Sequence, residues 1–171
     1  NMNILYLHNH KTQIENKFLT DDLYLFTEYL FNNNENIEQL EVFESLMFAL
    51  DAVHGLSFDD RRFYFDSIDR SFLPIFYDGK SKILYTKQKI GFEGLKQNIS
   101  FEAKNGSKKA KEIILQINKN DLLNELENSG ISINKQKLDT TIDKILKRLQ
   151  IISKSNPVDF QISKKNKYFS T

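Results

Sequence analysis

Three aspartates flank a pair of aromatic, strand-like segments in the stretch HGLSFDDRRFYFDSIDRSFLPIFYDG, which runs from His54 to Gly79. Asp59 and Asp60 precede the first segment, and Asp78 follows the second. Carboxylate oxygens are the ligands that Mg²⁺ prefers, and bound Mg²⁺ commonly bridges to substrate phosphates. If these carboxylates meet in the fold, they predict a magnesium site suited to phosphoryl transfer.

A β-hairpin would bring the aspartates together. Residues 62–66 (RFYFD) and 72–77 (FLPIFY) have the aromatic and β-branched composition of strands. Because the second strand of a hairpin returns beside the first, the residues before one and after the other meet at one end of the sheet. Pro74 cannot donate to a ladder, which predicts an edge strand or a bulge. We therefore expect Asp59, Asp60 and Asp78 to converge at this end, where two or three carboxylates would bind Mg²⁺.

Neighbouring residues suit the remaining tasks of phosphoryl transfer. His54 and Asp59 are both candidates for the catalytic base that takes the acceptor proton, and the sequence does not choose between them. Arg62, with Arg61, either pairs with the acids or holds phosphate bidentately. Gly79 lets the backbone turn where a side chain would obstruct a ligand. Arg62 and Gly79 are thus the expected contacts to a phosphate-bearing cofactor.

The runs HGLSFDDRRFYFD and FLPIFYDG resemble the atypical protein-kinase-like family named after the spore-coat protein CotH, over about residues 40–84. The resemblance implies a kinase-like fold, ATP with Mg²⁺, and phosphoryl transfer to a protein or small hydroxyl acceptor. It implies that Asp78 is the metal-binding Asp after the second strand. Asp60 stands where such enzymes place a metal-holding Asn or Asp, and His54 lies in the catalytic loop.

The chain also departs from the kinase pattern. No Asp follows His54 in the catalytic triplet, and the sequence has no Gly-rich phosphate loop with its ion-paired Lys. We therefore expect either the C-terminal lobe of a longer enzyme, whose N-terminal lobe is missing here, or a reduced relative. The alternative function is a non-catalytic protein-interaction module or degenerate pseudokinase.

Each candidate residue also has an ordinary structural explanation. Asp-Gly is a frequent turn pair, so Asp78 and Gly79 suit a β-turn. Asp59 and Asp60 suit a solvated loop, and a histidine at a helix C-terminus is favoured by the helix dipole. His8 and His10 alternate as two ligands on one strand face would, but no third ligand lies at a suitable spacing.

The rest of the sequence predicts an α+β, mostly helical fold, a kinase C-lobe-like helical domain with a small antiparallel β-hairpin. Gly55 is expected to cap the second helix in a left-handed conformation, with His54 at the helix end. Asn118 and Gly130 are expected to begin and end the fourth helix. Strands are expected at residues 2–7 and 80–86, and helices at residues 22–31, 37–53, 108–117, 121–128 and 138–152. The last helix is expected to bury one apolar stripe: Leu138, Ile142, Ile145, Leu146, Leu149 and Ile152.

Side-chain patterns assign the core and the surface. Four phenylalanines of the hairpin form an expected core stripe: Phe63, Phe65, Phe72 and Phe76. The basic residues of two helices are expected on solvated surface: Lys108, Lys109, Lys111, Lys144, Lys147 and Arg148. We expect one domain over residues 1–153, followed by an extended or frayed tail at residues 154–171.

Composition limits the partners. The 171 residues include 24 Lys and Arg against 23 Asp and Glu, so a net charge of +1 gives no field that attracts nucleic acid or a membrane. No apolar run approaches the roughly 18 residues that span a bilayer. The absence of cysteine excludes disulfides and thiolate metal sites, and it favours a reducing compartment such as the cytoplasm.

Overall fold

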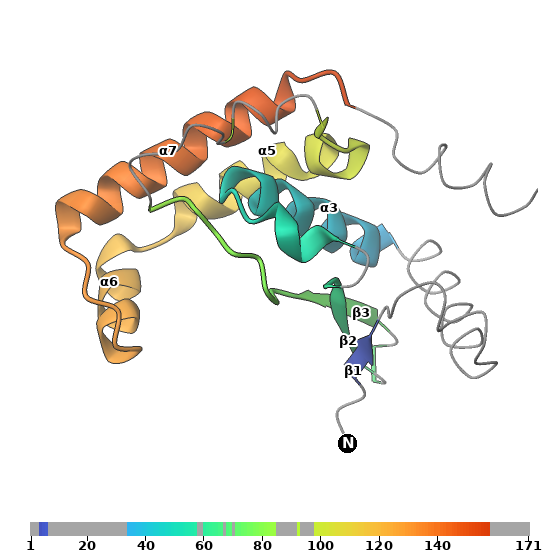
Figure 1. The fold of residues 1–171 in the computed structure, drawn as a ribbon, viewed down its shortest axis with the longest axis horizontal. Helices are drawn as coiled ribbons and strands as arrows, with labels where there is room; N and C mark the ends of the chain where they lie inside the picture. Colours follow the sequence, from blue (N-terminus) through green and yellow to red (C-terminus); the bar gives the residue numbers. More distant parts are fainter. Residues whose placement is uncertain are drawn as a thin grey trace, which may run out of the picture.

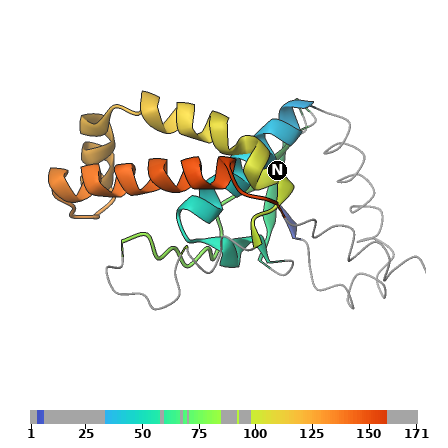
Figure 2. The same cartoon turned by 90° about the horizontal axis from the view of Figure 1, so that it is seen from above.

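A computed structural model describes residues 4–6, 34–57, 60–66, 68–69, 71–84, 92 and 98–157. In this part of the chain, helices α3 (Asn34–Ala49), α5 (Phe101–Gln116) and α7 (Lys135–Ser153) pack together, and a small antiparallel sheet lies against α3 (Figure 1). Seen from above, α5 and α7 run side by side, with α6 (Lys119–Asn128) at one end (Figure 2). The predicted α+β, mostly helical fold is confirmed.

The sheet has the strand order β1-β2-β3 and contains the predicted hairpin. Strand β2 (Arg62–Asp66) pairs antiparallel with β3 (Ser71–Ile75) and, on its other side, with β1 (Ile4–Tyr6). Pro74 lies opposite Phe63 on β3, the edge strand that the proline predicted. The hairpin therefore carries the chain from the residues before β2 to those after β3 at the same end of the sheet.

Helix α3 ends earlier than predicted, and in a different way. Asp51, not Gly55, adopts the left-handed conformation, with a φ of 55°. The amide of Asp51 donates to the carbonyl of Phe48 at 3.1 Å, and that of Ala52 donates to Met47 at 2.8 Å. These are the two hydrogen bonds of a Schellman motif, so Asp51 occupies the position where glycine is usual.

Gly55 instead lies in a short 3₁₀ helix, η1 (Val53–Leu56), and His54 belongs to this turn rather than to the end of α3. A Cβ on Gly55 would lie 2.6 Å from the carbonyl oxygen of Tyr77 and 2.7 Å from Cε of Met47. Close approach of the residues after β3 therefore explains this glycine, and the left-handed cap predicted for it was wrong.

The crossing of α3 and α5 depends on small residues. Gly106 is buried, and a Cβ there would lie 2.1 Å from the backbone carbon of Glu41. Ser45 donates to the carbonyl oxygen of Ala103 across the interface. Helix α5 begins at Phe101 rather than at residue 108, and the side chain of Ser100 caps it by accepting from the amide of Ala103 at 3.1 Å. The first two turns of α5 are thus the part that packs most closely.

The apolar stripe predicted for α7 is buried at Leu138, Ile142, Ile145, Leu149 and Ile152, and Leu146 is half-buried. Arg148 was wrongly predicted to be solvated: it is buried, its Nη1 donates to the carbonyl of Ala49 at 2.8 Å, and its guanidinium stacks over the ring of Phe92. Lys144 donates to the carbonyl of Ile83 at 2.9 Å, and burial lowers its pKa. Lys108, Lys109 and Lys147 are exposed.

Residues 80–84 do not form the expected strand. Their polar groups bond to the residues that end α3 instead. Oγ of Ser81 donates to the carbonyl of Leu50 at 2.7 Å, and the amide of Lys82 donates to the carbonyl of Asp51 at 3.3 Å. Phe76 was expected in the core but is 54% exposed, whereas Phe63 and Phe72 are buried.

Helix α6 begins and ends where predicted. Oδ1 of Asn118 accepts from the amide of Asn120 at 3.0 Å, and Gly130 is left-handed with a φ of 78°. Within the described residues, no helix has the length and apolarity needed to cross a membrane. Several predictions lie outside the described residues: the helix at residues 22–31, His8 and His10, the side chain of Phe65, residues 85–86 of the strand expected at residues 80–86, and most of the C-terminal tail.

Candidate functional site

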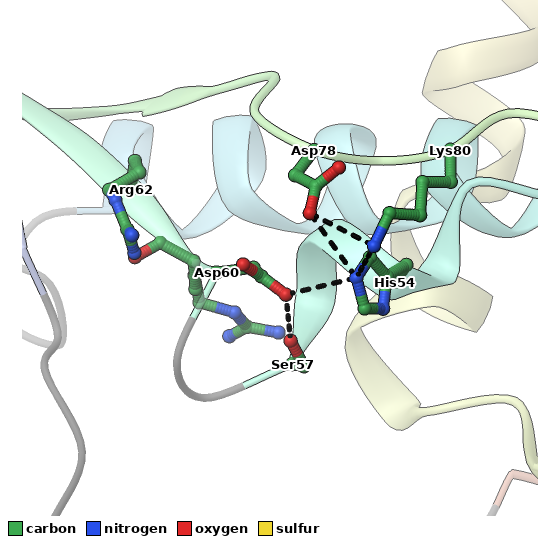
Figure 3. Close-up of polar contacts among 7 residues, drawn as sticks. His54, Ser57, Asp60, Arg62, Asp78 and Lys80 are labelled. Atoms are coloured by element: carbon green, nitrogen blue, oxygen red, sulfur yellow. Dashed lines mark hydrogen bonds and ion pairs between the residues drawn. The ribbon is translucent and has the colours of Figure 1, made fainter.

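Three side chains from three separate segments meet beside the hairpin (Figure 3). His54 lies on η1, Asp60 lies in the turn before β2, and Asp78 lies in the loop after β3. One ligand atom from each lies within 4.8 Å of the others. Nε2 of His54 is 3.3 Å from Oδ2 of Asp60 and 3.3 Å from Oδ2 of Asp78. The expected convergence of Asp60 and Asp78 is therefore confirmed, and their role as metal ligands stays a prediction.

A tight turn after η1 positions Asp60. The amides of Asp60 and Arg61 both donate to the carbonyl of Ser57, at 3.2 and 3.0 Å. Oγ of Ser57 donates to Oδ2 of Asp60 at 2.8 Å, so the carboxylate is held by the residue that starts the turn. Asp60 is consequently the least exposed of the three side chains, at 17%.

Glu44 anchors this turn to the helices. Nη2 of Arg61 donates to Oε1 of Glu44 at 2.8 Å, and Oγ of Ser100 donates to Oε2 at 2.7 Å. The carboxylate of Glu44 is buried in α3, so it joins α3, the start of α5 and the turn that carries Asp60. Arg61 was expected to pair with the loop acids or with phosphate; the structure gives it Glu44 as partner.

The loop after β3 holds Asp78 in an uncommon backbone conformation. Asp78 and Lys80 both have positive φ, of 40° and 47°, and Gly79 between them does not. A Cβ on Gly79 would lie 2.7 Å from the ring of Phe76 and 3.2 Å from Cβ of Ala52. The glycine therefore permits close packing, whereas the sharp turn expected of it is made by its neighbours. Left-handed backbone at a residue with a side chain costs about 1–2 kcal/mol, and such strain is concentrated at functional sites.

Lys80 is a member of the site that the sequence did not indicate. Its Nζ lies 2.5 Å from Nε2 of His54 and 3.1 Å from Oδ2 of Asp78. The only sequence signal is that Lys80 follows Asp78 by two positions, and a lysine beside an Asp-Gly turn is ordinarily solvated. The left-handed backbone at both residues turns the two side chains to the same point (Figure 3).

The donor set fits a divalent cation. Two ligands at right angles on an ion with 2.1–2.4 Å bonds lie roughly 3.0–3.4 Å apart. The two distances from His54 to the carboxylates, both 3.3 Å, match that spacing. The side chains of His54 and Asp78 are 43% and 38% exposed, so the group is open to an ion or substrate from solvent. Two carboxylates suit Mg²⁺, and the added imidazole also suits Mn²⁺ or Zn²⁺.

The other predicted contacts are not part of this group. Arg62 is buried, its guanidinium stacks 4.7 Å from the centre of the Tyr77 ring, and its Nη1 donates to the carbonyl of Arg61 at 3.2 Å. Figure 3 shows its side chain apart from His54. Gly79 is buried. Arg62 and Gly79 thus do not fit an open phosphate site. Asp59 lies outside the described residues, so the choice between Asp59 and His54 as base stays open.

No protein-family model, curated protein or solved structure matches the chain. The resemblance to the CotH-type family therefore stays a prediction.

Proposed function

We propose that this chain is the lobe of a metal-assisted phosphotransferase, in which Asp60 and Asp78 hold a divalent ion and His54 or Asp59 takes the proton of a hydroxyl acceptor. The observation that supports this proposal is the meeting of three ligand atoms, from segments far apart in sequence, within 4.8 Å. A bound divalent ion would neutralise phosphate charge and align the phosphoryl group with the acceptor.

The chain's own residues would then orient the acceptor. The imidazole of His54 is partly exposed beside both carboxylates, so it is accessible to an acceptor hydroxyl. A positioned imidazole accelerates proton transfer by about 10²–10⁴-fold. The turn held by Ser57 and Glu44 keeps the carboxylate of Asp60 in place without rearrangement on binding. ATP as the phosphoryl donor comes from the family resemblance, and we assign no residue to its phosphates.

Metal titration tests the first half of the proposal. Isothermal titration with Mg²⁺, Mn²⁺ and Zn²⁺ should detect binding to the wild-type chain and a loss of at least tenfold in affinity in Asp60→Asn and Asp78→Asn. Asp69→Asn removes an exposed carboxylate from the hairpin turn and should bind as the wild type does. Equal affinity in all four proteins would place the ion elsewhere. A preference for Zn²⁺ over Mg²⁺ would make His54 a ligand rather than the base.

A phosphotransfer assay tests the second half. Labelled ATP with the chain should give metal-dependent transfer to the protein itself or to added hydroxyl acceptors, and Asp78→Asn should abolish it while leaving the melting temperature nearly unchanged. Undiminished transfer in Asp78→Asn would contradict the assigned role.

The second candidate is a non-catalytic protein-interaction module, and a different feature favours it. Helix α6 contributes no buried residue, and large apolar side chains in the last turn of α5 and just after α6 are exposed: Ile113 by 40%, Leu115 by 62% and Ile131 by 47%. Exposed apolar patches often mark protein contacts.

A ligand that binds the native state must raise its melting temperature. If Mg²⁺ with ATP leaves the melting temperature unchanged, this second candidate is favoured.

A further inference from the structure

The ammonium group of Lys80 lies where a bound cation would interact with the site. Nζ contacts Nε2 of His54 at 2.5 Å and Oδ2 of Asp78 at 3.1 Å (Figure 3). Those two atoms belong to the same set of three that could hold a divalent ion. The backbone of Lys80 has a φ of 47°, so the side chain reaches this point from a conformation that lysine rarely adopts.

Proton placement shows why a cation is needed there. An ammonium group has donors only, so a hydrogen bond from Lys80 to Nε2 of His54 assigns the lone pair to Nε2 and the ring hydrogen to Nδ1. Nε2 then has no hydrogen to offer to Asp60 or Asp78, although each carboxylate oxygen lies 3.3 Å away. Three acceptors face one another, and a positive charge among them offsets their repulsion.

We infer that Lys80 is the built-in cation of this site: its ammonium holds the three acceptors together in the metal-free protein, and a divalent ion must displace it. This inference depends on the proposed function, because it requires that a metal ion binds there. The lysine side chain is 58% exposed and has a flexible four-carbon stem, so it can swing into solvent when an ion enters. Lys80 would thus set a threshold of metal concentration, below which its ammonium group stays in contact with His54 and Asp78 and no ion binds.

Mn²⁺ is the probe for a titration, because it accepts both carboxylate and imidazole ligands. Lys80→Met should bind Mn²⁺ about two- to fivefold more tightly than the wild type, the factor expected when a partly exposed charge contact is removed. Lys80→Arg keeps the positive charge and should bind nearly as the wild type does. Lys82→Met is the matched control, because it removes the same charge from an exposed lysine two residues along the chain.

The outcomes separate this inference from the proposed function. Tighter binding by Lys80→Met than by Lys82→Met supports it. Equal affinity in these two variants, or weaker binding by Lys80→Met, overturns the displacement of Lys80 but leaves the metal site intact. An absence of Mn²⁺ binding in every variant overturns both proposals.

A measurement without metal tests whether Lys80 stabilises the metal-free site. In the presence of a chelator, Lys80→Met should melt at a lower temperature than Lys82→Met, and adding Asp78→Asn to Lys80→Met should reduce that difference, because one of the repelling charges is gone. Identical melting of Lys80→Met and Lys82→Met would show that Lys80 does not hold the metal-free site.

Discussion

Arg61 and Glu44 lie 17 positions apart in sequence and form a short ion pair, with Nη2 to Oε1 at 2.8 Å. The carboxylate of Glu44 is 5% exposed and the side chain of Arg61 is 25% exposed. This pair is the connection between the turn that carries Asp60 and helix α3. Because a buried carboxylate needs its donors, the placement of the candidate site and the stability of the fold are coupled at this point.

Arg61→Met should therefore affect both properties. It leaves the carboxylate of Glu44 buried with Ser100 as its remaining donor among those described, which should lower the free energy of unfolding by about 2–3 kcal/mol. Urea denaturation measures this loss, and the Mn²⁺ affinity should fall with it because Asp60 loses its anchor. Lys109→Met is the control: its pair with Glu38 is more than half exposed on both sides, so about 0.5 kcal/mol or less is expected. Equal losses in the two variants would show that Glu44 is not an anchor.

Asp51 offers a stabilising change. It is buried, its φ is 55°, and no donor among the described residues bonds to its Oδ2. Asp51→Gly removes both the left-handed strain and the buried carboxylate, so thermal unfolding should show a gain of about 0.5–1 kcal/mol. Asp51→Ala removes the carboxylate but keeps the strain, and it should be less stable than Asp51→Gly. The reverse order would show that the unfolded-state entropy added by glycine outweighs the left-handed strain that it relieves.

Two glycines provide a matched pair. Gly106→Ala would place a Cβ within 2.4 Å of the backbone of Glu41 and Val42, so α3 and α5 must separate, at a cost of about 3 kcal/mol or more. Gly130→Ala meets no atom within 4 Å, and only its left-handed backbone adds cost, about 1 kcal/mol. Chemical denaturation of the two variants should separate them clearly. Similar losses would mean that α3 and α5 do not cross closely at Gly106.

Glu102 predicts a dependence of stability on pH. Burial raises its pKa above 4.5, and the carboxylate of Glu44 nearby raises it further. The native state therefore binds more protons than the unfolded chain, and the free energy of unfolding falls as the pH rises from about 4.5 through the folded pKa. Glu102→Gln should consequently be more stable than the wild type at pH 7 and should lose that advantage near pH 4. Glu112→Gln, an exposed change on the same helix, should show no such crossover. A constant difference across this range would contradict the assignment.

The parts of the fold that follow apolar periodicity could be predicted from sequence. The stripe on α7 and the aromatic hairpin were both found because large apolar side chains recur at the period of the element. The first two turns of α5 were missed because small residues make their contacts, and Ala103, Gly106 and Ser107 carry little hydropathic signal. Arg148 was misplaced because it belongs to a run of basic residues, a pattern typical of solvated helix surface. Its hydrogen bond to the carbonyl of Ala49 joins residues far apart in the sequence, so the pattern does not indicate it.

The site was predictable to a similar extent. Asp60 and Asp78 could be placed together because a hairpin fixes which of its flanks meet. Gly55 was assigned the wrong role because a left-handed cap and a close approach both require glycine, and the sequence does not distinguish them. Lys80 was missed because its position depends on the backbone φ of two non-glycine residues, which no pattern in the sequence reveals.

Pro74 has a consequence for association between molecules. It lies on the edge strand β3, opposite Phe63, and a proline on an edge strand ordinarily turns its missing amide away from the sheet. An incoming strand from another chain would find the row of donors interrupted within a strand of five residues. The edge strand β3 therefore resists the edge-to-edge pairing that leads to fibrils. This resistance matters because the neighbouring site must remain open to solvent.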